Sequence, residues 1–478
     1  MNYLSLLRIR LSVVSPEAKL VLLRFLQKYG PGRSAGRGVA ALAADMGVSG
    51  PLVKRGLSEL TVEGLLIRIA LSAEYECSEA LRETLAEDDG SREASPLHLL
   101  ADHVLNPASE IMSLKSYDRR VSDTGLEPAT PAQRKATARK RLGETASGTN
   151  RLLLAVLLIH ADEFGVVRGL GISDLSALAG LKRARVEMHL FKLNELGVIR
   201  FKVAGFSGSR VLGSPKTLYY LNLHHRCFSG FRHDAMVLVL QAKTDSRENL
   251  QTHAGRLFLG REGPSGFDFY WPLIDQASAE QVELFDKAIV SVMLESKLAG
   301  GGRAELLMLQ TIVDGYASSL LSRHWSSLSA KESFTDDDLL KLIQSQIKVP
   351  FRRSLPIQVF SGLKPDLFLY KMAFLLACQY RTLLDPAVGA GGEGMKFQIL
   401  PISDQAGDRG GRSVLALRKD GSVDRRCVVI TEGQREIQSF DYEAVMSVAQ
   451  CLDHGLLNEF HALKRYGRAR QSTSSRRL

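Results

Sequence analysis

The sequence predicts an α+β protein in which two similar helix–turn–helix–strand segments precede a larger mixed region. One pattern of turn glycines and apolar residues occurs twice in the first half, and helical and strand periodicities alternate in the second half. The length of 478 residues allows about three domains. Apolar residues make up 45% of the chain and charged residues 24%, which is typical of a globular protein with a full core.

The first segment covers residues 39–69 and follows an apolar helix expected over 17–29. A short helix ends at Gly47, where a positive φ suits a tight turn. Ser49 is placed to cap a second helix, with Pro51 in its first turn, where a missing N–H costs nothing. Gly64 ends this helix before the β-prone residues 66–69. Apolar residues recur on one helix face at Val53, Leu57 and Leu60.

The second segment covers residues 175–203 and repeats this pattern after an apolar helix expected over 150–164. Every matched position lies 133 residues after its counterpart, as Gly180 does after Gly47. The other matched positions are Val186, Leu190, Leu193 and Gly197. Five matches in residue type at a single offset indicate that the two segments share one fold.

Both segments resemble the winged helix-turn-helix of bacterial regulators such as the MarR and GntR types, including the ending L-x-x-L-x-x-x-G-[LV]-[LI]. The resemblance covers 16–78 and 150–223 and implies tandem winged-helix domains followed by a mixed α+β C-terminal domain. The arrangement is more distantly similar to RepA-type plasmid initiators, in which one winged helix pairs subunits and another reads DNA. Those proteins are more compact than this chain.

A recognition helix needs basic or polar side chains near its N-terminus to reach bases and phosphates. The second segment has such residues at Lys182, Arg183, Arg185 and, one turn later, His189. Its wing is expected to run from the strand 199–204 through a Gly/Ser-rich tip to the strand 217–223. Further basic residues lie on this wing at Arg200, Lys202, Arg210 and Lys216. We therefore expect the second domain to read the major groove.

The first segment is less basic. Its wing is expected to be nearly absent, and Glu74 and Glu76 would repel phosphates. Lys54 and Arg55 remain as DNA contacts. The sequence therefore favours dimerisation, or a weaker half-site, for this first domain.

Five parts are expected along the chain. They are a first winged helix-turn-helix domain (1–83), a partly disordered linker with a basic cluster (84–149), a second winged helix-turn-helix domain (150–228), an α+β C-terminal domain (229–463) and a basic tail (464–478). The linker cluster and the tail together hold eleven cations, one more than the net charge of +10, so they could contact phosphates as flexible arms or simply be solvated.

The C-terminal domain matches no motif with a known role. Helical periodicity is found over 277–298, 304–323, 336–346 and 366–383, and a final helix is expected over 441–463. Strands are expected over 396–402, 414–418 and 426–430, the last two joined as a hairpin by the turn 419–422. In a regulator such a domain would bind a small-molecule or protein effector or hold subunits together.

Several motifs of other function classes are set aside. Residues 389–394 contain G-x-G-x-x-G, but after a helix rather than a strand, so a flexible loop is expected. The acidic run 336–338 is expected to cap a helix, with Thr335 and Asp338 as the pair. The histidines 224, 225 and 233 lack metal spacing, and the five scattered cysteines are expected to be buried thiols. We expect no enzyme, no cofactor and no metal.

The chain is thus expected to be a cytoplasmic, bacterial-type regulator of transcription. It has no apolar run long enough to cross a membrane and no recognisable signal peptide. The expected partners are double-stranded DNA and a second copy of the chain in a homodimer. The alternatives are a replication or partition factor of a mobile element and a winged-helix assembly protein that does not bind DNA.

Overall fold

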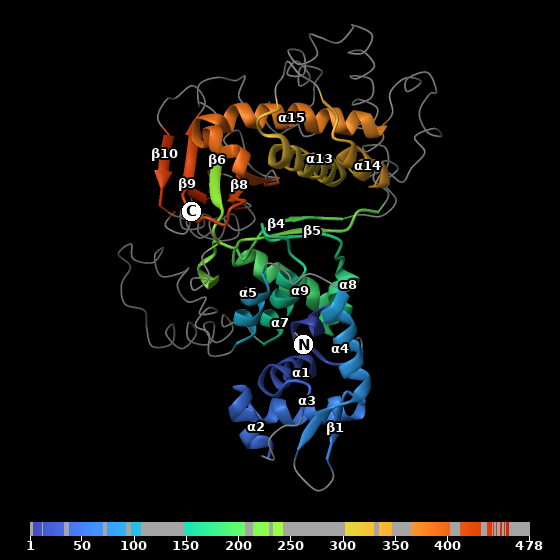
Figure 1. The fold of residues 1–478 in the computed structure, drawn as a ribbon. Helices are drawn as coiled ribbons and strands as arrows, with labels where there is room; N and C mark the ends of the chain where they lie inside the picture. The colour runs from blue at the N-terminus through green and yellow to red at the C-terminus, as the bar shows by residue number, and fades with distance from the viewer. Residues whose placement is uncertain are drawn as a thin grey trace, which may run out of the picture. The chain divides into compact units, whose positions relative to one another are not determined.

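The computed structural model describes residues 3–106, 148–241, 302–346 and 365–457, each range with short gaps. The chain is a mixed α+β protein that divides into two compact units (Figure 1). Unit 1 comprises 1–199 and 221–232, and unit 2 comprises 200–220 and 233–478. No helix in the described part is long and apolar enough to cross a membrane.

Unit 1 begins with the short 3-10 helix η1 (Tyr3–Leu7) and the helix α1 (Pro16–Tyr29). Ser15 caps α1, since its hydroxyl accepts the N–H of Ala18 at 3.2 Å. The helices α2 (Val39–Met46) and α3 (Gly50–Val62) follow, joined at Gly47, whose φ is 63°. Ser49 is the N-cap residue of α3, but its side chain makes no capping hydrogen bond.

A short strand pair completes the first segment. β1 (Leu66–Arg68) pairs antiparallel with β2 (Tyr75–Cys77), with Leu66 opposite Cys77. Each strand has only three residues, so the expectation that this segment would nearly lack a wing stays a prediction. Two helices then follow within the stretch predicted as the end of the first domain and a linker, α4 (Glu79–Ser91) and α5 (His98–Leu105). The predicted basic cluster between 134 and 141 lies outside the described residues.

The second segment repeats the first in the same register. It contains α7 (Gly148–Ile159), β3 (Val166–Val167), α8 (Ile172–Ala179), α9 (Arg183–Glu195) and β4 (Ile199–Val203). The bounds of α8 and α9 lie 133 residues after those of α2 and α3. β5 (Leu218–Leu221) completes a three-stranded sheet of order β3-β5-β4.

The hydrogen bonds of the two turns repeat as well. After α2 the N–H of Val48 donates to the carbonyl of Ala43, and after α8 the N–H of Leu181 donates to the carbonyl of Ser176, both at 3.0 Å. Each of these hydrogen bonds closes a loop of six residues, as in the Schellman motif at the C-terminus of a helix. This motif needs a residue in the left-handed conformation, and Gly180 has that conformation, with a φ of 66°. The equivalent apolar positions of α3 and α9 are all buried (Val53, Leu57, Leu60, Val186, Leu190 and Leu193). The predicted repeat is confirmed at the level of helices, turns and buried faces.

Unit 2 is built on a five-stranded sheet of order β10-β9-β6-β8-β7. β6 (Met236–Gln241), β7 (Met395–Ile399), β8 (Arg412–Arg418), β9 (Cys427–Thr431) and β10 (Ile437–Phe440) form this sheet. The helices α13 (Gly302–His324), α14 (Asp337–Gln346) and α15 (Pro365–Val388) pack with it around one apolar core. These three helices confirm three of the predicted ones, while the predicted helix 277–298 lies outside the described residues.

The strand order of unit 2 corrects the predicted hairpin. The turn after β8 is present, but β8 and β9 do not pair, because β6 lies between them, antiparallel to β8 and parallel to β9. Five of the six residues of β6 are apolar, and such a strand is favoured in the centre of a sheet. The predicted helix over 441–463 is also wrong in its first part, since Asp441 and Met446 are not helical.

Candidate nucleic-acid interface

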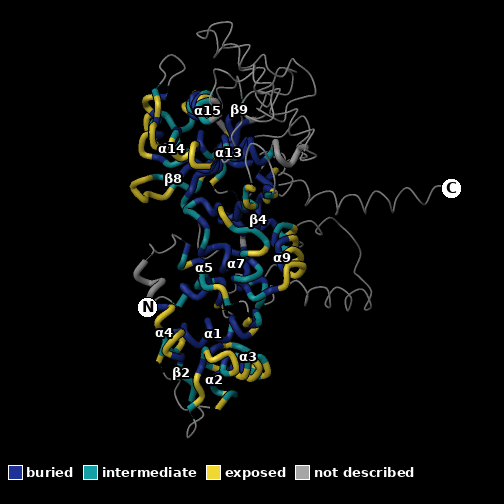
Figure 2. Tube along the Cα trace, turned by 90° about the vertical axis from the view of Figure 1, so that its right-hand side faces the viewer, coloured by how far each residue is buried: buried dark blue, intermediate teal, exposed yellow. Residues whose placement is uncertain are grey.

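The first turn of α9 presents exposed basic side chains. Arg183 and Arg185 are exposed, as is Lys182, the N-cap residue. No acidic residue lies in this turn, so the positive end of the helix dipole adds to the charge of the side chains. The guanidinium of Arg183 donates to the hydroxyl of Ser173 on α8 at 2.8 Å, which holds it beside the turn. Figure 2 shows exposed residues, in yellow, along this helix.

His189 lies one turn further along α9 and is half-buried. Burial lowers the pKa of its imidazole below the usual value, and the positive charges of Lys192 and Arg185 lower it further. A neutral imidazole can accept one hydrogen bond and donate another. The ring can therefore take part in polar recognition at neutral pH without adding charge.

The first segment presents fewer cations at the equivalent helix. Lys54 and Arg55 are exposed on α3, and the Nε of Arg55 donates to the carbonyl of Pro51 at 3.4 Å. The first turn of α3 contains Pro51 and Leu52, whereas α9 has Ala184 and Arg185 there. The two helices thus share a register and a buried face but differ in the charge of the exposed side.

Residues before α1 pack against the turn that precedes α9. A Cβ atom added to Gly180 would lie 2.3 Å from the carbonyl oxygen of Val14, so only glycine fits this contact. Arg10 forms an ion pair with Asp174 at 2.9 Å, and Asp174 also accepts the N–H of Gly171 at the start of α8. The turn that positions α9 is therefore held in part by the first fifteen residues.

Lys19 on α1 also links the residues before α1 to the end of α8, and it does so from within the core. Its ammonium group donates to the carbonyl of Leu178 near the end of α8 at 2.6 Å and to the carbonyl of Ile9 at 2.9 Å. The side chain is fully buried, and burial lowers its pKa to about 7. α1 also packs against both α3 and α7. Sequence reasoning missed this role of Lys19, because a lysine on an amphipathic helix is usually exposed.

The predicted wing cations do not all remain exposed. Lys202 on β4 and Lys216 before β5 are exposed, while Arg210 lies outside the described residues. The prediction for Arg200 is wrong, since this residue is only 1% exposed. Its guanidinium forms a two-pronged ion pair with Glu443 and donates to the carbonyl of Leu456 at 3.1 Å. A guanidinium enclosed in this way cannot reach a phosphate.

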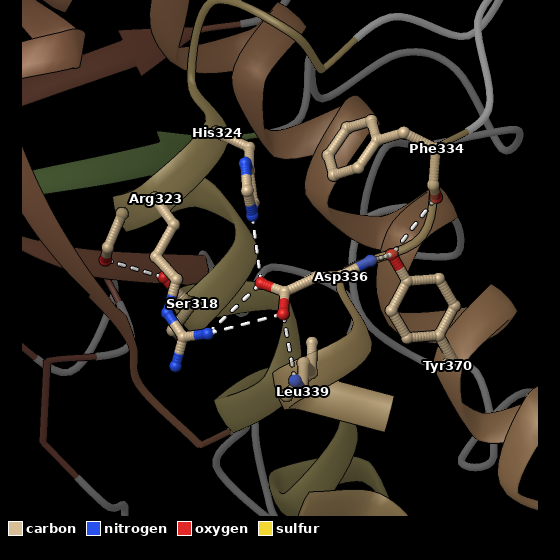
Figure 3. A network of polar contacts seen from close by, with 8 residues as sticks. Ser318, Arg323, His324, Phe334, Asp336, Leu339 and Tyr370 are labelled. Carbon is tan, nitrogen blue, oxygen red and sulfur yellow. Dashed lines mark hydrogen bonds and ion pairs between the residues drawn. The ribbon is translucent and has the colours of Figure 1, made fainter. Parts of the chain in front are cut away.

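Unit 2 contains a polar network around Asp336 at the start of α14 (Figure 3). Its carboxylate accepts the N–H of Leu339 at 2.9 Å, together with Arg323 at 3.1 Å and the imidazole of His324 at 2.9 Å. Burial alone would raise the pKa of Asp336, but these hydrogen bonds and the positive charge hold it below the usual value. Capping by the acidic run is confirmed, but the capping residue is Asp336 rather than Thr335.

A second network lies deeper in unit 2. Arg412 donates to the carboxylate of Asp314 at 2.7 Å, to the hydroxyl of Tyr380 at 2.6 Å and to the carbonyl of Leu400 at 3.1 Å. All four groups are buried, with α13, α15 and β8 supplying the three side chains. The opposite charges of Arg412 and Asp314 are thus paired inside unit 2, as buried charges require.

The motifs set aside in the sequence can be located in the described part. Residues 389–394 form the short 3-10 helix η7 rather than a flexible loop, and Gly392 lies directly against the indole of Trp325. The five cysteines are buried and free, as predicted. No group of three or more His, Cys, Asp or Glu residues within the described ranges could hold a metal ion. The exposed start of α9 remains the best candidate for a functional surface.

The apolar residues on the exposed side of α9 are a feature that sequence reasoning missed. Met188 is 57% exposed and Phe191 is 39% exposed. The helix register contains the signal, because both residues fall opposite the buried positions Val186, Leu190 and Leu193.

Comparison with protein-family models, with curated proteins and with solved structures finds no match for this chain.

Proposed function

We propose that this protein binds double-stranded DNA through α9 and that it regulates transcription. The observation that carries the proposal is the exposed, acid-free cluster of Lys182, Arg183 and Arg185 at the start of the second helix of a helix–turn–helix. In proteins of this kind the start of that helix contacts base edges in the major groove. Arginine suits this role because its guanidinium matches the acceptors of guanine.

The strands support a winged helix as the fold of the second segment. The sheet order β3-β5-β4 places one strand before the helix–turn–helix and two after it. Lys202 and Lys216, which belong to unit 2, are exposed as well, and phosphate contacts of such residues position a protein on DNA without reading its sequence. The first segment shares the helix–turn–helix but offers only Lys54 and Arg55 in α3, so it would serve for packing or for a weaker contact.

Contacts in unit 1 support a fixed presentation of α9. The turn before the helix is held by Gly180 against Val14, by Lys19 and by the ion pair of Arg10 with Asp174. A recognition helix whose position is already fixed in the free protein loses less conformational entropy when it binds DNA. The two segments would therefore act as one preformed module.

The experiment is a selection of duplexes from a random-sequence library by the full-length protein, followed by footprinting on the enriched duplex and on the DNA flanking its own gene. Enrichment of one operator-like site supports a transcriptional regulator. Enrichment of iterated repeats supports a replication factor instead. No enrichment, combined with no salt-dependent binding to any duplex, would refute DNA binding.

A further inference from the structure

Two arginines from different helices lie at the end of α5. The guanidinium of Arg24 on α1 donates to the carbonyl of Leu105, the last residue of α5, and to the side-chain oxygen of Gln27. The guanidinium of Arg151 on α7 donates to the carbonyl of the next residue, Asn106, at 2.8 Å. α7 packs against both α1 and α5, so three helices of unit 1 bring the two cations together (Figure 1).

These two positive charges have no acidic partner in the part of the chain that the structure describes. Neither guanidinium forms an ion pair there, although Arg24 is only 5% exposed. The three helices contain two acidic residues, Glu17 and Asp102. Glu17 lies two helical turns before Arg24, which is about 10 Å. Asp102 accepts hydrogen bonds from the hydroxyl of Tyr3 and, at 2.7 Å, from the amide of Gln27, so its link to Arg24 runs through Gln27.

The helix end alone does not balance the two guanidiniums. The carbonyls at the C-terminus of a helix supply only about half a negative charge, so about one and a half positive charges remain. Burial, together with the positive charge of Arg151, lowers the pKa of Arg24 to about 10. Burial also lowers the pKa of Arg151. Buried positive charge is costly unless an anion pairs with it.

We propose that Arg24 and Arg151 together bind a small anion that carries a phosphate group. A guanidinium has five N–H donors in one plane, and a phosphate can accept two of them at once. The described residues accept from two nitrogen atoms of Arg24 and from one of Arg151, so donors remain on both side chains. Lys28 is exposed one turn after Arg24 on α1 and adds a third cation on that side of the helix.

The burial of Arg24 favours a small anion over a nucleic acid, because the backbone of a duplex cannot reach a guanidinium that is almost fully enclosed. Arg151 is half-buried and Asn106 is exposed, so solvent reaches the site from their side. The bound anion would join α1 of the first segment to α7 of the second and would stabilise their contact. This inference goes beyond the proposed function, since it does not depend on α9.

The test follows hydrogen exchange of residues 98–106 in the full-length protein while inorganic phosphate replaces chloride at constant ionic strength. We expect phosphate to slow exchange there and the effect to saturate, because a ligand that binds only the folded state protects the segment that it holds.

Arg151→Gln tests the site with the smaller risk to the fold, since it leaves the contacts of the buried Arg24 in place. It should weaken the affinity for phosphate about tenfold or more, because a hydrogen bond to a charged group contributes at least that much. Arg24→Gln should weaken the affinity by a similar factor. Arg82→Gln is the matched control, because Arg82 is a cation of the same unit that pairs with Glu76 at 3.7 Å. It should keep the wild-type affinity for phosphate.

Three outcomes would overturn the inference. If exchange is the same in phosphate and in chloride at one ionic strength, the wild type has no site for phosphate. If phosphate protects both arginine variants as well as the wild type, the two guanidiniums only cap α5. If phosphate has no effect and Arg151→Gln instead weakens binding to every duplex, the arginine contacts the DNA backbone, and the proposed function stands without this site.

Discussion

Replacing Gly180 by alanine should loosen the packing around the turn that positions α9. The residue has a φ of 66°, a left-handed conformation that costs a non-glycine residue about 1–2 kcal/mol. The new Cβ atom would also lie 2.3 Å from the carbonyl oxygen of Val14, so that segment must move. Overpacking of this kind costs about 1–3 kcal/mol more. The total loss of stability around the turn is therefore about 2–5 kcal/mol.

Gly64→Ala is the matched control, because Gly64 has a φ of 68° but nothing within 4 Å of an added Cβ atom. Gly64→Ala should lower the stability only by the cost of the left-handed conformation, about 1–2 kcal/mol. Hydrogen exchange of the full-length protein, followed by mass spectrometry of its peptides, measures both losses locally. Gly180→Ala should speed exchange in α1 and α8, whereas Gly64→Ala should speed it only in α3 and β1. Equal effects of the two variants on α1 would refute the reasoning that residues before α1 brace the turn.

Three further predictions concern charged groups. Asp336→Ala should lower the free energy of unfolding by about 1 kcal/mol at pH 7. Because the pKa of Asp336 is depressed in the folded protein, the wild type loses this contribution as the pH falls through that pKa, so calorimetry below about pH 4 should find a smaller difference. Lys19→Met should remove a rise in stability between about pH 7 and 10, where the unfolded chain binds more protons than the folded one, as urea titrations across that range would measure. Asp314→Ala should cost about 3–5 kcal/mol by leaving the buried Arg412 unpaired, and Asp314→Leu with Arg412→Met should recover most of the loss of urea midpoint.

Local patterns in the sequence predicted the repeat well. Gly47, Gly64, Gly180 and Gly197 all have positive φ, as their places after helices indicated. The buried faces of α3 and α9 followed from steps of three and four residues, and these are properties of the helix alone. Three helices and three strands of unit 2 were predicted for the same reason, usually within two or three residues of their observed ends, whereas β6 and β10 were not predicted.

The features that sequence reasoning missed depend on contacts between distant residues. β6 lies between β8 and β9, so residues near position 238 pair with residues near position 415. No local pattern in the sequence encodes that pairing. Arg200 was expected on an exposed wing because it lies in the predicted strand 199–204 together with Lys202. Its partner Glu443 lies 243 residues away, so the local pattern could not predict its burial.

The measurement that tests the central claim most directly compares two double variants on the selected duplex. Arg183→Ala with Arg185→Ala changes the start of α9, and Lys54→Ala with Arg55→Ala removes the same number of cations from α3. If α9 reads the DNA, the first variant should lose about 1–3 kcal/mol of binding for each base contact removed, while the second should lose clearly less. Equal losses, or no loss from the α9 variant when circular dichroism shows an intact fold, would contradict the account.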